Sequence, residues 1–171
     1  MDNEINILIE DELWNSVDLE SISNKVLTQI SVELSMTTDS YELSILACND
    51  SRIVVLNAEF RGKENPTNVL SWPSYDLIPE KAGSVPYMPP KSEFDEPYIN
   101  LGDIAISYET CVAEANAAKL SIKNHVTHLL THGILHLLGY DHETDADAEL
   151  MENLEIKLLS DMGIGNPYET V

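Results

Sequence analysis

The segment YELSILACNDSRIVVLNAEFRG, residues 41–62, contains the change of pattern that decides the fold class. Residues 41–49 alternate between two sets of side chains, with the period of two that a β-strand shows. Asp50 or Ser51 can cap a helix directly after this strand, and the helical pattern ends near Gly62. The segment therefore predicts a strand that is followed closely by a helix.

The segments on either side continue this alternation of strand and helix. Apolar patterns predict further strands at residues 5–10, 69–73 and 101–107. They predict further helices at about residues 16–35, 108–120, 122–138 and 144–162. Strands and helices interleave early, and the last third of the chain is helical. This order predicts an α+β fold, an α/β sandwich in which helices pack mainly on one face of a small mixed four-stranded sheet.

One long interruption falls between two of these strands. Residues 73–98 hold six of the eight prolines of the chain, with acidic residues scattered among them. A loop of this length in a compact domain is usually functional or mobile. We therefore expect a proline-rich, acidic surface excursion that joins two neighbouring strands.

The overall composition favours a folded, water-soluble protein. With 171 residues and 43% hydrophobic residues, we expect one domain over residues 1–171. We expect a cytoplasmic protein with no membrane partner, because no apolar run has the length of a membrane span and no signal-like segment opens the chain. Cys48 and Cys111 form no CxxC motif, so we expect buried free thiols.

The charge of the chain limits which partners it can bind. Nine basic residues against thirty acidic residues give a net charge of −21. Such a surface repels nucleic-acid phosphates at long range. A function on RNA therefore requires a local basic patch or a partner that delivers the RNA.

Histidines follow one face of the helix predicted at residues 122–138. On a helix that turns about 100° per residue, the histidines at 125, 128, 132 and 136 fall within about 60° of one another. Two pairs with a spacing of four residues are available, His128/His132 and His132/His136, but the earlier pair has no third histidine at the equivalent spacing, where position 138 is leucine. We therefore expect His125 and His128 to be ordinary hydrogen-bonded or exposed residues.

The sequence HGILHLLGYDH, residues 132–142, has the spacing of a metal site. His132 and His136 lie one helical turn apart, and Gly139 allows a sharp turn that brings His142 back towards the helix end. Three imidazoles can bind one zinc ion and leave its fourth position open. Zinc is the first choice, although nickel, copper or iron also accept imidazole ligands.

The residue after the first of these histidines argues against a protease. Zinc proteases with similar histidine spacing carry a glutamate there as general base, whereas this chain has Gly133. Zinc can itself activate water, so hydrolysis in general is not excluded. Asp141 is either an acceptor for the N–H of a ligand histidine or a simple turn residue.

Arg61 is the second candidate for a functional residue. It is one of two arginines in the chain and lies beside Lys63. A guanidinium suits the charge that develops on phosphate in a transition state. With thirty acidic residues in the chain, a simple ion pair is the alternative role.

Three segments resemble the YbeY family of bacterial rRNA-maturation endoribonucleases. They are HGILHLLGYDH (132–142), NAEFRGKENPTNVLSWP (57–73) and LGDIAIS (101–107). The resemblance extends in order over about residues 55–162, although the excursion looks longer than the usual connection. It implies a zinc-dependent, single-strand-specific endoribonuclease that acts in 16S rRNA 3′-end maturation and ribosome quality control.

The resemblance also implies the residues and the partners of that activity. It assigns metal binding to His132, His136 and His142, with one Zn²⁺ per chain, and a catalytic role to Arg61. The implied partners are ribosomal RNA, the small ribosomal subunit and ribosome-assembly proteins. The general base stays open between Asp141, Glu143 and water activated by the zinc.

Two other classes of function remain as alternatives. A ribosome-assembly factor would act by protein contact and use the metal as a structural pin, whereas a metallohydrolase of peptides or small esters would need a carboxylate near the metal. The basic residues discriminate between the nuclease and the assembly factor. RNA cleavage gains support if the five residues in question cluster around the metal, and the assembly factor gains support if they scatter. These residues are Arg52, Arg61, Lys63, Lys119 and Lys123.

Overall fold

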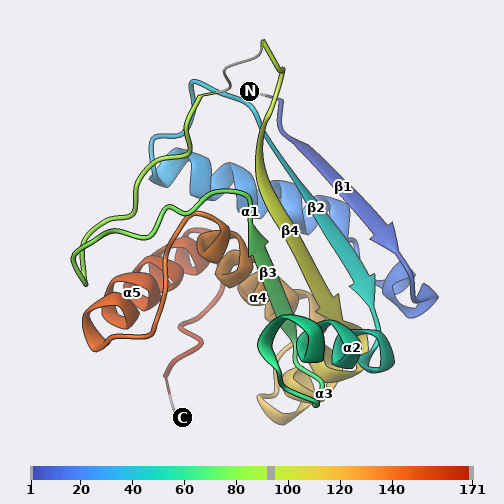
Figure 1. Cartoon of the computed structure of the whole chain (residues 1–171). Coiled ribbons are helices and arrows are strands. Elements are labelled where there is room, and N and C mark those ends of the chain that lie inside the picture. Colours follow the sequence, from blue (N-terminus) through green and yellow to red (C-terminus); the bar gives the residue numbers. More distant parts are fainter. Residues whose placement is uncertain (1, 92–94, 170–171) are drawn as a thin grey trace.

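The protein, seen here in a computed structural model that describes residues 2–91 and 95–169, is built on a twisted sheet (Figure 1). Within these residues the strands are β1 (Glu4–Ile9), β2 (Tyr41–Cys48), β3 (Val69–Pro73) and β4 (Ile99–Ser107). Their order across the sheet is β1-β2-β4-β3. β1, β2 and β4 run parallel, and β3 pairs antiparallel with β4 at one edge. The expected mixed four-stranded sheet is confirmed.

The helices of the described residues connect these strands and form the C-terminal third. They are the 3-10 turn η1 (Glu12–Ser16) and the helices α1 (Leu19–Glu33), α2 (Asp50–Arg61), α3 (Tyr108–Ala117), α4 (Ile122–Leu137) and α5 (Asp145–Asp161). Each α-helix corresponds to one that the sequence predicts. The N-cap of α2 differs, because Asn49 rather than Asp50 or Ser51 accepts a hydrogen bond from the amide of Arg52.

The main hydrophobic core lies between one face of the sheet and the helices α1, α4 and α5. Alternate residues of β2 and β4, among them Leu43, Ile45, Ile104 and Ile106, point into this core and are almost fully buried. Figure 1 shows α1 and α4 behind the sheet and α5 beside α4. The sheet thus gives α4, the histidine helix, a rigid support.

The opposite face of the sheet has a smaller core under α2. Cys48, Ile53, Leu70 and Ala105 are buried there. Figure 1 shows α2 over one end of this face, so helices do pack mainly on one side of the sheet, as expected. Cys48 and Cys111 are free and buried, and burial raises the pKa of each thiol to about 12, so both behave as small apolar residues.

The segment between β3 and β4 joins two neighbouring strands, as expected. It starts along the histidine helix and is held there by the buried side chain of Leu77. The amide of Tyr87 donates to the carbonyl of Leu77 at 2.9 Å, and the amide of Gly83 donates to Asp147 of α5 at 2.7 Å. The first contact lies within the excursion, and the second ties the excursion to the start of α5. Its residues 92–94 lie outside the described residues.

No helix in the described part of the chain has the length and apolar character needed to cross a membrane.

Candidate metal centre

The turn after α4 directs the chain back towards the histidines. Gly139 has φ = +93°, a conformation that favours glycine. A Cβ atom at this position would lie 2.8 Å from the backbone carbon and oxygen of Leu77, which is too close for any side chain. The turn therefore needs glycine for its backbone angle and for the close approach of the excursion.

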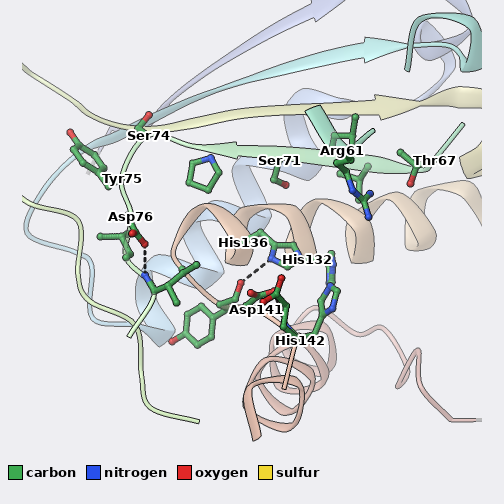
Figure 2. A pocket seen from close by; sticks show the side chains of 18 of the residues that line it. Arg61, Thr67, Ser71, Ser74, Tyr75, Asp76, His132, His136, Asp141 and His142 are labelled. Carbon is green, nitrogen blue, oxygen red and sulfur yellow. Dashed lines mark hydrogen bonds between the residues drawn. The ribbon is translucent and has the colours of Figure 1, made fainter. Parts of the chain in front are cut away.

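His132, His136 and His142 meet at the pocket beside this turn (Figure 2). Each offers a ring nitrogen, and the three nitrogens lie within 4.8 Å of one another. The Nε2 atoms of His132 and His136 are 2.9 Å apart. The rings of His132 and His142 are stacked with their centroids 5.4 Å apart. The sequence motif thus brings all three predicted ligands to one point.

The other ring nitrogens of the two helical histidines are occupied by fixed acceptors. Nδ1 of His136 donates to the carbonyl of Tyr140 at 2.9 Å, and Nδ1 of His132 lies 2.6 Å from Oε1 of Glu155. These partners place the proton on Nδ1 and leave the Nε2 lone pairs facing each other. Two lone pairs at this distance repel, and a metal cation satisfies both. The residues therefore fit a metal ion.

Electrostatics also favours a neutral, coordinating form of His136. Burial, followed by the proximity of His132, lowers the pKa of His136 to about 4. At neutral pH the ring is uncharged and can donate its lone pair.

Glu155 of α5 is a part of the site that sequence reasoning missed. Its side chain is fully buried. Burial alone would raise the pKa of this carboxyl group, but hydrogen bonds from His128 and His132 outweigh that effect and lower the pKa to about 2. The sequence held one signal, because Glu155 lies on the same stripe of α5 as the buried residues Met151 and Leu158.

The first half of α4 holds the remaining two histidines. Nε2 of His128 lies 3.0 Å from Oε2 of Glu155, and Nε2 of His125 lies 3.1 Å from Oε1 of Glu114. Both rings are thus held by carboxylates outside the pocket.

Gly133 faces the sheet, which explains why no glutamate occupies this position. A Cβ atom here would lie 3.2 Å from Cδ1 of Ile104 and 3.2 Å from Oγ of Ser71. The Ser71 hydroxyl donates to the carbonyl of Gly133, also at 3.2 Å. The glycine lets α4 lie close to β3 and β4, and a longer side chain would have to push the helix away.

The pocket around the histidines has a volume of about 700 Å³. Arg61, the last residue of α2, lines it on the side of β3, and Figure 2 shows this side chain near Thr67 above the histidines. Asp76, Asp141 and Glu143 line the same pocket. With one arginine and three carboxylates, the pocket would repel an RNA phosphate unless a cation were present.

The other four basic residues that the sequence singled out do not line this pocket. Arg52 pairs with Glu10 at 3.4 Å and lies in a separate cleft on the opposite face of the sheet. The five residues thus do not cluster around the histidines. Arg61 alone among them accompanies the histidines.

The comparison with known proteins identifies the family of the chain. Residues 5–163 match the family model described as Endoribonuclease YbeY. The chain belongs to the YbeY family. A relative from Dinoroseobacter shibae is 48% identical over 97% of this chain and 91% of its own length, and one from Jannaschia sp. is 46% identical over 96% and 99%. Both relatives are named Endoribonuclease YbeY.

A solved structure shares the fold of this chain. The solution structure of TM1509 from Thermotoga maritima matches with a TM-score of 0.52, over 97% of this chain and 99% of that protein. Its sequence identity is 19%, so the match concerns the fold alone.

Proposed function

We propose that this YbeY protein is a zinc-dependent, single-strand-specific endoribonuclease that acts in 16S rRNA 3′-end maturation and in ribosome quality control. One observation carries the proposal: three histidine nitrogens converge within 4.8 Å in a pocket that Arg61 also lines. The names of the curated relatives support RNA as the substrate.

His132, His136 and His142 are the proposed ligands of one Zn²⁺ ion. The two helical histidines offer neutral Nε2 lone pairs, and imidazole is a preferred zinc ligand. Three protein ligands leave a position open, which is typical of a catalytic zinc site rather than a structural one. Bound there, zinc would supply a Lewis acid that polarises a phosphoryl oxygen or lowers the pKa of a water molecule.

Arg61 is the proposed catalytic residue of the chain itself. Its guanidinium would bind the non-bridging oxygens of the scissile phosphate and stabilise the extra negative charge of the transition state. Its place in the pocket supports this role, since the chain's other arginine, Arg52, pairs with Glu10 in a different cleft.

The general base is proposed among the carboxylates of the pocket. Asp141 accepts the amide of His142 at 2.8 Å, so this carboxylate also orients the loop that carries the third ligand. Glu143 lines the pocket and is exposed to solvent. Glu143 is therefore the freer of the two to take a proton from a nucleophile.

The acidic charge is compatible with RNA cleavage if a partner presents the RNA. We propose that the small ribosomal subunit and ribosome-assembly proteins do so in the cytoplasm, and that residues 1–171 work as one domain. The position of the excursion at 73–98 supports presentation of the RNA by a partner, because residues 74–78 form one wall of the pocket. This wall would admit a single strand of RNA to the pocket and exclude a duplex.

The test is cleavage of a labelled single-stranded RNA with an unprocessed 16S 3′ tail, presented on small ribosomal subunits at defined zinc. We expect His132→Ala and Arg61→Ala to abolish cleavage, and Arg52→Ala, the matched control in the other cleft, to cut like wild type. Zinc binding by Arg61→Ala separates a lost catalytic group from a lost metal. Unchanged cleavage by a zinc-loaded Arg61→Ala protein would exclude this residue from catalysis.

A second candidate function is a ribosome-assembly factor that acts by protein contact. It is favoured by the absence of four of the five basic residues from the lining of the pocket. It would be the better description if wild type binds small subunits but cleaves no faster than His132→Ala. The metallohydrolase alternative requires a carboxylate near the metal, and Asp141 and Glu143 line the pocket. It is weaker because the curated relatives are named endoribonucleases, and because position 133, where zinc proteases carry their glutamate, faces the sheet.

A further inference from the structure

Glu155 joins the proposed metal centre to the C-terminal segment of the chain. One of its oxygens, Oε1, accepts a hydrogen bond from Nδ1 of His132 at 2.6 Å. The other, Oε2, accepts hydrogen bonds from Nε2 of His128 at 3.0 Å and from the hydroxyl of Tyr168. A fully buried carboxylate is costly unless such donors satisfy it. The orientation of His132 therefore depends on groups that never reach the pocket.

The chain turns back after α5 to bring Tyr168 to this carboxylate. Gly163 ends the helix with φ = +78°, and the amide of Ile164 donates to the carbonyl of Leu159 at 2.8 Å. Asn166 then accepts the amide of Tyr168 at 2.8 Å, which shapes the last turn. The ring of Tyr168 packs edge-to-face on His128, with the centroids 5.6 Å apart.

We propose that Glu155 and Tyr168 are positioning residues of the metal centre, and that the C-terminal segment at 163–169 acts as a latch which holds His132 ready for the metal. Tyr168 and His128 fix the carboxylate, and the carboxylate fixes the ring of His132 with Nε2 towards His136. This inference rests on the proposed metal site. Outer hydrogen bonds of this kind set the tautomer, orientation and basicity of a ligand histidine.

A consequence of the latch is reciprocal coupling between metal and C-terminal segment. If docking of Tyr168 raises the affinity for zinc, then zinc must stabilise the docked segment by the same factor. A purely structural role of Tyr168 would not give this result. In that case the ring would only cover His128, and phenylalanine would replace tyrosine without loss.

The first experiment measures zinc affinity of the full-length protein by competition with a chromogenic chelator. We expect Glu155→Gln to bind zinc about 10–100-fold more weakly than wild type, and Tyr168→Phe about tenfold more weakly. Glu149→Gln removes the same charge from an exposed position of the same helix, and Tyr87→Phe removes a hydroxyl from an exposed tyrosine of the excursion. Both controls should bind like wild type.

Two further readouts separate positioning from packing. With Co²⁺ in place of zinc, the visible absorption bands of Glu155→Gln and Tyr168→Phe should shift relative to wild type, because the orientation of His132 changes. Hydrogen exchange of the amides at 163–169 should slow when zinc is added to wild type but not when it is added to Tyr168→Phe.

Each outcome bears on the inference in a distinct way. Zinc binding by wild type that is unchanged in both Tyr168→Phe and Glu155→Gln would overturn the latch and leave the metal site intact. Absence of zinc binding by wild type would overturn the metal site and the latch together. Equal zinc affinity of wild type and Tyr168→Phe, with a loss only in Tyr168→Ala, would reduce Tyr168 to a packing residue.

Discussion

The two halves of α4 carry histidines on the same face of one helix, yet the two pairs use opposite ring nitrogens. In the first half, Nε2 of His125 and of His128 each faces a carboxylate. In the second half, Nδ1 of His132 and of His136 is engaged, and the Nε2 atoms converge 2.9 Å apart. Spacing produces a stripe of imidazoles, but the fixed partners of each ring decide which nitrogen remains free to bind a metal.

The sharpest test of this comparison is to delete one histidine from each half. We expect His136→Ala to lose zinc binding by more than about 100-fold, since a direct ligand should matter more than an outer hydrogen bond. His125→Ala should bind zinc with the affinity of wild type, because its ring faces Glu114. Metal content after gel filtration measures both affinities. An equal loss in the two variants would contradict the division of α4 into a metal-binding half and a half whose histidines face carboxylates.

The second test concerns the turn at Gly139, which brings His142 to the pair His132 and His136 as the proposed third ligand. The pair in the first half of α4 has no such partner. Gly139→Ala forces a side chain into a backbone angle of +93° and against Leu77. We expect it to lower the free energy of unfolding by about 3 kcal/mol, from strain and overpacking together. Gly163→Ala, also at positive φ but with no atom within 4 Å of its Cβ, should lose only about 1 kcal/mol. Urea denaturation measures the difference, and equal losses would show that the contact with Leu77 is unimportant.

A third test uses the pKa of His136 in the metal-free protein. Because burial lowers its pKa from 6.5 to about 4, the unfolded chain binds a proton that the folded protein does not bind between these values. Stability should therefore fall by roughly 2–3 kcal/mol as the pH drops from 6.5 to 4. The low pKa of Glu155 adds a loss only below about 4.5, where its stabilisation disappears. Urea denaturation of wild type and His136→Asn across this range measures the effect, which should be absent in the variant above pH 4.5.

The smallest expected effect is at Gly133. Alanine here would press on Ile104 and Ser71 by a few tenths of an ångström but would gain helix propensity. We expect a net loss of about 1 kcal/mol in the free energy of unfolding and a measurable loss of zinc affinity, since α4 would shift from the sheet. Gly133→Glu should lose more stability and gain no peptidase activity. Peptide cleavage by that variant would contradict the orientation of position 133.

The sequence predicted those parts of the molecule whose signal is local. The alternation in β2, the start of α5 near residue 144 and the turn glycine after α4 each depend on neighbours in the chain, and all three occur where expected. The convergence of His142 with His132 was also predictable, because helix pitch and one glycine fix it.

The parts that the sequence did not predict depend on contacts between distant segments. Only its place on the apolar stripe of α5 distinguishes Glu155 from the other acidic residues, and its role follows from the packing of α5 on α4. Tyr168 belongs to no pattern in the sequence. The pockets that Arg52 and Arg61 line are similar in this respect, because they depend on where α2 packs on the sheet. Periodicity describes one element at a time, whereas these positions are set by how elements meet.

The strand order has a consequence for how the protein folds. β2 pairs in parallel with β4, so that Cys48 lies beside Ser107, while α2, β3 and the whole excursion lie between them in the chain. Closing such a long loop is slow relative to forming a local hairpin. Arg61 and the histidine helix are brought to one pocket by this closure. We therefore expect the pocket to gain Arg61 late, after β4 has joined the sheet, whereas the three histidines lie within residues 132–142 and can converge earlier.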